Sequence, residues 1–211
     1  CSIRFLISST ELFEAASNSK TLKEKSDAEI ETSVVNTLAG DQWVMAKDRE
    51  ELAELLITKA PQNPIGYREL VKSKLAQRQG GAAVNYGKKL VQLEPQNPDN
   101  QFLLGRAYLD AQKPEQAMQP LLLAVGSDLP KPAYFTALGQ SYSQQGQYAL
   151  AIASQKKALE LAPNDQFALL QLGMALAFAD DEVKTVLGQL GAKYKYVEEP
   201  WNVATDLILE Q

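Results

Sequence analysis

Apolar and polar residues alternate with a helical period along much of the chain, and residues 132–165 show the pattern in full. The stretch 133–144 places apolar or small residues three and four apart, at Phe135, Leu138, Gly139 and Tyr142. This spacing puts them on one face of an α-helix. A similar stripe follows from Tyr148 to Leu161, at Ala151, Ile152, Ala158 and Leu159. Gly146 separates the two stripes, and Gly commonly ends a helix. The stretch is therefore predicted to form two amphipathic helices joined by a short turn.

Residues of several kinds recur at an interval of 34 along the chain. The recurring residues are Gly105, Gly139 and Gly173; Ala83, Ala117 and Ala151; and Leu70, Leu104, Leu138 and Leu172. Pro61, Pro95 and Pro163 mark unit ends, and the sequence Pro-Gln-Asn-Pro occurs at 61–64 and again at 95–98. A small residue in each helix lets two backbones approach closely, and proline stops a helix because it lacks the N–H that a helix interior requires.

These residues and their spacing resemble the tetratricopeptide repeat family, whose unit is a helix–turn–helix of this length. The resemblance implies an all-α fold, a right-handed superhelical solenoid of antiparallel helix pairs. Four units are expected, at 64–97, 98–131, 132–165 and 166–199, within the segment 64–199. A degenerate repeat is expected at 30–63, after an N-terminal arm or partly helical linker at 1–29.

Several positions depart from the family pattern. Val71 replaces the first-helix Gly of the other units, and Gly87 stands where a large apolar residue is usual. Pro120 falls inside a predicted second helix, which it should kink or cause to begin late. Leu129 replaces a unit-ending proline, and Thr185 replaces the packing Ala of the last unit.

Composition narrows the possible chemistry. The chain is 45% hydrophobic and 22% charged, which is typical of a folded protein, and its net charge is −5. A general nucleic-acid binder needs a basic surface, so no nucleic-acid partner is expected. With no histidine and a single cysteine, zinc sites and Ser-His or Cys-His pairs are excluded. No phosphate-binding glycine motif is present, so we expect no metal, no cofactor and no catalysis.

The two ends of the chain leave alternatives open. Residues 200–211 are expected to form a capping helix with an apolar stripe at Trp201, Ala204, Leu207 and Ile208. The alternative is that this helix occupies the concave groove of its own chain or of a neighbouring one, which would permit self-association. Cys1 is either the lipid-bearing first residue of a bacterial lipoprotein or an incidental thiol. A periplasmic or membrane-associated location and a cytoplasmic one therefore both remain open. The sequence contains no run of 18 apolar residues of the kind that spans a membrane.

The resemblance also implies where a ligand would bind, because the family's partners lie in a concave groove lined by the first helix of each unit. The corresponding candidates here are Arg68, Lys72 and Leu75; Phe102, Leu103, Arg106 and Leu109; Thr136, Gln140 and Gln144; and Phe167, Leu170, Met174 and Phe178. A peptide is expected to cross the units 64–97 and 98–131. The alternative is that the phenylalanines belong to the core and that Arg68 and Lys72 pair with Glu69 and other neighbours.

The expected function is a non-catalytic scaffold or adaptor that binds a protein or peptide, as an assembly factor. Leu103, Ala133 and Ala137 stand where chaperone-binding members carry polar or charged groups, which argues against a co-chaperone. Two alternatives are a membrane-tethered or lipoprotein accessory factor of a bacterial secretion, pilus or cytochrome-assembly system, and a regulatory module of a larger enzyme.

Overall fold

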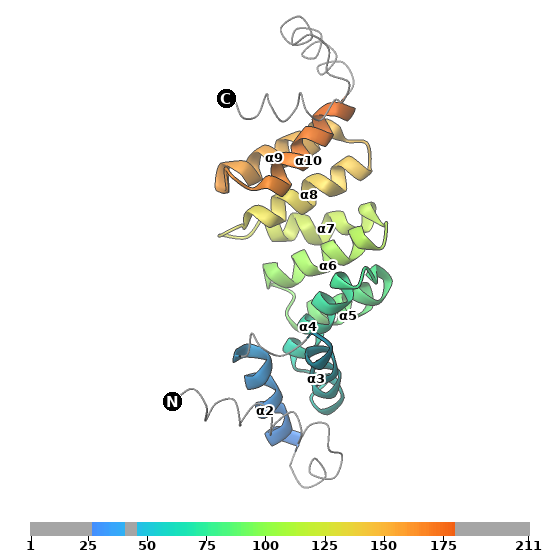
Figure 1. The fold of residues 1–211 in the computed structure, drawn as a ribbon, viewed down its shortest axis with the longest axis vertical. Helices are drawn as coiled ribbons and strands as arrows, with labels where there is room; N and C mark the ends of the chain where they lie inside the picture. The colour runs from blue at the N-terminus through green and yellow to red at the C-terminus, as the bar shows by residue number, and fades with distance from the viewer. Residues whose placement is uncertain (1–26, 41–45, 180–211) are drawn as a thin grey trace, which may run out of the picture. The chain divides into compact units, whose positions relative to one another are not determined.

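The computed structural model describes residues 27–40 and 46–179 of the chain. The predictions about Cys1, the second helix of unit 166–199, the segment 200–211 and the N-terminal arm, apart from its residues 27–29, lie outside these residues. The chain divides into two compact units, residues 1–95 and 96–211. The helices are labelled in Figure 1. In the first unit they are α2 (Asp27–Gly40), α3 (Ala46–Lys59), α4 (Pro64–Ala76) and α5 (Gly80–Leu93). In the second they are α6 (Pro98–Asp110), α7 (Pro114–Val125), α8 (Pro132–Gln144), α9 (Tyr148–Leu161) and α10 (Gln166–Phe178).

Local sequence explains where α4 and α6 begin. The side-chain oxygen of Asn63 accepts a hydrogen bond from the Ile65 backbone N–H at 3.0 Å, and that of Asn97 accepts one from Asp99 at 3.1 Å. The next residue in each case is a proline at the first helical position, where its missing N–H costs nothing. The repeated Asn-Pro pair therefore starts a helix as well as ending the preceding unit.

The turns between α4 and α5, between α6 and α7 and between α8 and α9 each contain one residue with a left-handed backbone. Gly146 has φ +72°, and the equivalent residues Arg78 and Gln112 both have φ +57°. The N–H of the next residue bonds back five residues in each turn, as from Gln79 to the Lys74 carbonyl at 2.9 Å. This is a helix-ending motif in which glycine is usual at the left-handed position. Only the turn at Gly146 has the residue that adopts this conformation without strain.

The first unit has a core made by three helices. Val34 and Leu38 of α2 pack with Leu52, Ala53 and Leu56 of α3 and with Leu70 of α4 in one cluster. Arg49 ties the same helices together, since its guanidinium donates to the Leu38 carbonyl at 2.8 Å and to Glu69 at 2.8 Å. The helices α2 and α3, which precede residue 64, thus pack together and share a core with α4.

In the second unit each helix packs on its chain neighbours, from α6 to α10, and the first helices also meet: α6 contacts α8, and α8 contacts α10. Small residues permit the close packing within pairs. Ala117 and Ala151 are completely buried. A Cβ on Gly139 would lie 3.2 Å from the backbone carbonyl oxygen of Ala151, so α8 and α9 approach at these two positions. The all-α class of paired antiparallel helices is confirmed, and the described residues form no strand.

Pro120 lies inside α7 and does not delay the start of that helix. We expected it to kink its helix or to delay the start, but α7 begins at Pro114 and continues through Pro120 to Val125. Pro120 is buried, as are Ala117 and Leu121 beside it. The apolar area that this part of α7 buries offsets the backbone hydrogen bond that proline cannot make. The expectation of a late start was therefore wrong.

Candidate functional site

The first helices of the pairs in the second unit form a continuous layer, because α6 contacts α8 and α8 contacts α10. The opposing helices α7 and α9 lie behind this layer as the second members of their pairs. Side chains on the outer face of α6, α8 and α10 can therefore contact one ligand together. We call this surface the α6–α8–α10 face.

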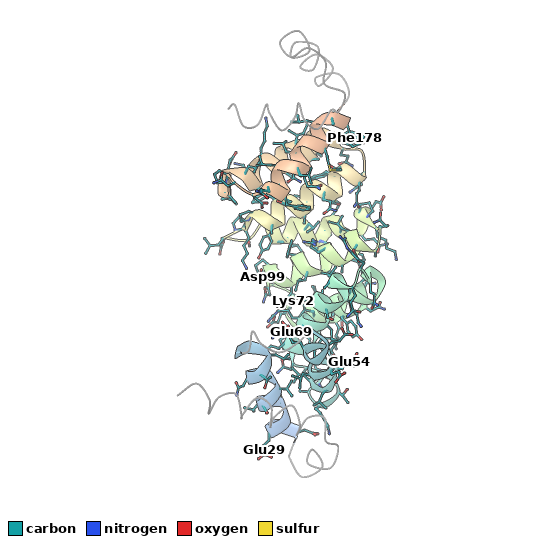
Figure 2. The ribbon with its side chains drawn as sticks, in the orientation of Figure 1. Glu29, Glu54, Glu69, Lys72, Asp99 and Phe178 are labelled. Atoms are coloured by element: carbon teal, nitrogen blue, oxygen red, sulfur yellow. The ribbon has the colours of Figure 1, made fainter. Side chains whose placement is uncertain are left out.

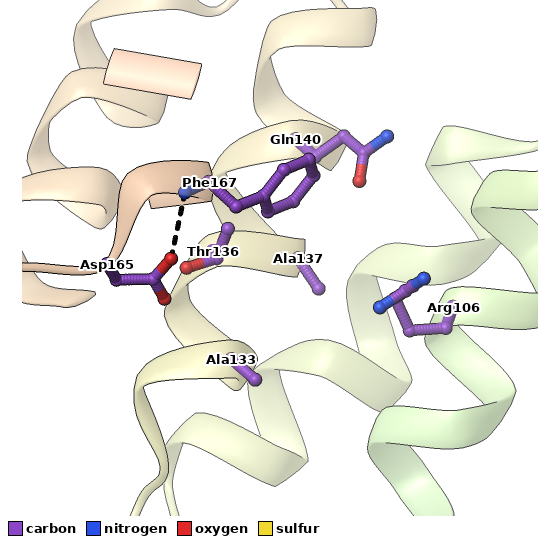
Figure 3. Close-up of a pocket in the computed structure, with 7 residues that line it drawn as sticks. All are labelled: Arg106, Ala133, Thr136, Ala137, Gln140, Asp165 and Phe167. Carbon is purple, nitrogen blue, oxygen red and sulfur yellow. Dashed lines mark hydrogen bonds between the residues drawn. The ribbon is translucent and has the colours of Figure 1, made fainter. Parts of the chain in front are cut away.

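A small pocket of about 60 Å³ lies on the α6–α8–α10 face. It is lined by Arg106 of α6, by Ala133, Thr136, Ala137 and Gln140 of α8, and by Asp165 and Phe167 at the start of α10. Figure 3 shows the Phe167 ring extending over α8, with Arg106 on the α6 side of the pocket. The two alanines leave space that larger side chains would fill, so the pocket suits one apolar side chain of a ligand.

The polar groups of this pocket are held in defined ways. The Asp165 carboxylate accepts hydrogen bonds from the backbone N–H groups of Phe167 at 3.0 Å and Ala168 at 3.2 Å. It therefore caps α10 and fixes the position of Phe167. The Thr136 hydroxyl donates to the Pro132 carbonyl at 3.2 Å within α8. Gln140 is half-buried and Arg106 is exposed, so these two carry the polar groups that a ligand would meet.

An apolar stripe continues from the pocket along α10. Phe167, Leu170, Met174 and Phe178 are spaced by three, four and four residues, which places them on one helix face. Their exposed fractions are 51%, 53%, 40% and 58%. The opposite side of α10 is packed, since Ala168, Leu172, Gly173 and Ala175 are buried. The Phe178 ring also stacks on Tyr148 of α9, with 5.9 Å between centroids. A helix with large apolar side chains exposed in a row is typical of a contact surface.

The α6 side of the face is aromatic and cationic. The Phe102 ring lies 5.1 Å from that of Tyr134, and the Arg106 guanidinium carbon lies 5.8 Å from the centre of the Phe102 ring. The Tyr134 hydroxyl donates to Asp99 at 2.7 Å, and Lys131 donates to the same carboxylate. Burial raises the pKa of Tyr134, and the hydrogen bond to the Asp99 carboxylate raises it further. Tyr134 therefore stays a neutral donor that joins α8 to α6.

The remaining predicted residues of the second unit lie in different environments. Leu109 is only 3% exposed, because the last turn of α6, including Ala107 and Tyr108, is enclosed. Leu109 is thus a core residue and not a groove residue as we had expected. Phe102 and Leu103 are half-buried, and Gln144 is exposed at the end of α8. Phe102 therefore has both of the roles weighed from the sequence, as part of an aromatic cluster and as part of the surface.

The predicted cations of the first unit are engaged in ion pairs. Arg68 bonds to Glu94 at 2.7 Å, and Lys72 bonds to Glu69 at 2.8 Å; Figure 2 labels Glu69 and Lys72. Burial raises the pKa of Glu69, but hydrogen bonds from Lys72 and Arg49 outweigh it and the net pKa is lowered. The pairing with Glu69 that the sequence offered as an alternative is what the structure shows for Lys72. A ligand that used Arg68 or Lys72 would compete with these carboxylates.

Three pocket residues were not among the predicted site residues: Ala133, Ala137 and Asp165. Asp165 could have been found, because an Asp directly before a predicted helix is a preferred cap. The alanines carry no such signal, since their importance is the space they leave between α6, α8 and α10. Among the described residues no group of Cys, Asp and Glu side chains is arranged to hold a metal ion. None of the described helices is long and apolar enough to cross a membrane.

Comparison with known proteins agrees with the fold of paired helices. The family model of subunit 3 of the anaphase-promoting complex, or cyclosome, matches residues 76–158. No curated protein matches the chain. YrrB, a TPR protein with an unusual peptide-binding site, is similar in structure with a TM-score of 0.62 at 13% identity, over 82% of this chain and 90% of its own.

The chain has the tetratricopeptide repeat fold. Two further structures are similar to this repeat protein over 88% of its length and 78% of theirs, both at 17% identity. They are pilF of Pseudomonas aeruginosa, with a TM-score of 0.64, and PilW, a widely conserved type IV pilus biogenesis factor, with a TM-score of 0.60. At these identities the likeness shows that the repeat protein shares the fold of these structures.

Proposed function

We propose that this protein is a non-catalytic scaffold that binds a polypeptide segment on the α6–α8–α10 face and acts as an adaptor or assembly factor. The observation that carries the proposal is the exposed apolar stripe on α10 that begins at a pocket of side-chain size. Phe167 belongs to both, as a pocket wall and as the first residue of the stripe.

The shape and chemistry of the face suit a peptide. The stripe runs from Phe167 to Phe178, which are 11 residue steps apart, and is therefore about 16 Å long at 1.5 Å per step. Apolar side chains of one peptide can follow it while another enters the pocket, and Arg106 can bond an acidic group beside them. The similar protein YrrB has a peptide-binding site. Methionine and phenylalanine form adaptable contacts, and a peptide ordered on such a face is expected to bind at micromolar strength, about −8 kcal/mol.

The lining groups do not suit catalysis. The Thr136 hydroxyl is buried and donates to its own helix, and the Asp165 carboxylate caps α10. Neither has a base or nucleophile beside it among the pocket residues, and the chain contains no histidine. The polar groups that remain at the pocket, on Gln140 and Arg106, bind and orient a ligand but do not transfer protons readily near neutral pH.

Site-specific photo-crosslinking in the intact protein tests the proposal. A photoreactive phenylalanine derivative is placed at Phe167 in one variant and at Leu123 of α7 in a control. Both residues are 51% exposed, but Leu123 lies outside the α6–α8–α10 face. We expect the variant at 167 to crosslink a second polypeptide, identified by mass spectrometry, and the variant at 123 not to. Crosslinks to a partner from 123 and none from 167 would overturn the proposal.

A second candidate function is an accessory factor of a bacterial pilus, secretion or cytochrome-assembly system, tethered to the membrane or lipidated at Cys1. It is favoured by the similarity to PilW, a type IV pilus biogenesis factor. The identity of the polypeptide crosslinked from position 167 distinguishes the two functions. A component of such an assembly supports this candidate, and a partner without any link to one argues against it.

A further inference from the structure

Apart from the contact between Phe178 and Tyr148, the described residues leave the apolar stripe of α10 largely exposed. Phe167, Leu170 and Phe178 are each more than half exposed, and Met174 lies between them at 40%. By contrast, the opposite face of the same helix is buried. Contiguous large apolar side chains on a protein surface generally mark a contact.

The last twelve residues of the chain have the complementary sequence. In Pro200–Gln211 the apolar residues Trp201, Ala204, Leu207 and Ile208 fall at helical spacing. The charged residues of this segment are Asp206 and Glu210, both acidic. On the α6–α8–α10 face the charged side chain at the pocket that projects to the surface is the cation Arg106. The segment Pro200–Gln211 therefore matches the α6–α8–α10 face in two ways: it has an apolar stripe, and its charge is opposite in sign to that of Arg106.

The chain is long enough for the segment to reach this stripe. From Ala179, the last described residue, to Trp201 there are 22 residues. They could span up to about 70 Å if extended and still about 30 Å if helical. The stripe itself is only about 16 Å long by the same helical rise. A short tether of this kind gives an effective concentration in the millimolar range, so a segment of the same chain outcompetes a second copy at micromolar protein.

We infer that residues Pro200–Gln211 bind to the apolar stripe of α10 in the same chain and compete there with the polypeptide partner. This inference rests on the proposed function, since it takes the α6–α8–α10 face to be a peptide site and adds its regulation. The segment lowers the apparent affinity of the partner, because only the fraction of molecules with an open face can bind. A capping position at the end of the repeats is the competing arrangement for the same residues.

Tryptophan fluorescence distinguishes the two arrangements. The chain has two tryptophans, Trp43 and Trp201, so Trp43→Phe leaves Trp201 as the reporter in the full-length protein. Leu170→Glu places a charge in the stripe, and Leu123→Glu is a matched control at 51% exposure outside it. We expect Leu170→Glu to shift Trp201 emission to the red and to increase acrylamide quenching, with no change in Leu123→Glu. Equal emission in both variants would overturn the inference in favour of a cap.

Leu170→Glu could change Trp201 emission simply by unfolding the protein, so a disulfide trap tests the same contact without that substitution. In a Cys1→Ser background, the pair Leu170→Cys and Ala204→Cys should form an intramolecular disulfide on mild oxidation, and Leu123→Cys with Ala204→Cys should not. Failure of the first pair to form it, or a Trp201 spectrum that depends on protein concentration, overturns binding within one chain.

The regulatory effect has its own readout. Once the partner is known, Trp201→Ala in the full chain should raise its affinity several-fold. Unchanged affinity in Trp201→Ala contradicts competition but leaves the proposed function standing if crosslinks from position 167 still reach the partner. Loss of those crosslinks, with the disulfide between positions 170 and 204 intact, contradicts the proposed function instead.

Discussion

Gly105 of α6 faces Leu121 of α7 so closely that a Cβ atom on residue 105 would lie 2.5 Å from the Leu121 Cγ atom. Gly139 is in the same relationship to Gln155 one repeat later. The glycine that recurs every 34 residues therefore leaves room for a specific side chain of the partner helix. Leu121 is completely buried as a result.

Gly105→Ala should destabilise the protein even though alanine favours helices. The added methyl group overlaps Leu121, and overpacking of a well-packed core costs about 1–3 kcal/mol. Urea denaturation followed by circular dichroism measures the loss. Gly81→Ala in α5 is the control, because nothing lies within 4 Å of its added Cβ. It should leave stability unchanged or slightly raised; equal losses in both variants would contradict the assigned contact.

Gln112→Gly in the α6–α7 turn should stabilise the protein. Gln112 has φ +57°, and relief of a left-handed conformation in a residue with a Cβ atom is worth about 1 kcal/mol. Gly146→Ala is the converse change at the equivalent turn and should lower stability by a similar amount. Thermal unfolding of both variants checks the pair. A lower melting temperature for Gln112→Gly would show that the turn is not strained.

The Arg49–Glu69–Lys72 cluster predicts acid sensitivity in the first unit. The pKa of Glu69 lies below its ordinary value of 4.5 in the folded protein. Its contribution to stability is therefore present above pH 4.5 and is lost as the pH falls through the lowered pKa. Glu69→Gln should reduce the unfolding free energy at pH 7 and flatten its decline in acid. Glu54→Gln, at an exposed residue of α3 labelled in Figure 2, should do neither. Parallel pH profiles for wild type and Glu69→Gln would contradict this.

Sequence predicts the helices well here because their determinants are local. Pro64, Pro98 and Pro132 begin α4, α6 and α8, at the residues where the repeat units were expected to start. The pocket depends on contacts between helices 34 residues apart, so the space above Ala133 and Ala137 could not be inferred from either helix alone. Similarly, the partner of Arg68 is Glu94, 26 residues away, which no helical spacing indicates.

Charge reversal at Arg106 should weaken partner binding several-fold. Arg106 is the exposed cation of the pocket, and an acidic group of the ligand would lose its bond and meet a like charge. Raised salt should weaken binding to wild type in the same direction, because exposed charges are screened. Fluorescence anisotropy with a labelled partner peptide measures both. A salt-independent affinity, unchanged in Arg106→Glu, would remove Arg106 from the site.

The most direct test of the central claim is the affinity of the crosslinked partner segment for Phe167→Ala compared with Leu123→Ala. The two side chains are equally exposed in the protein, so a general loss of surface hydrophobicity affects both variants alike. Titration calorimetry with the full-length variants should show at least a tenfold loss for Phe167→Ala, about 1.4 kcal/mol, and none for Leu123→Ala. Wild-type affinity in Phe167→Ala would contradict peptide binding on the α6–α8–α10 face.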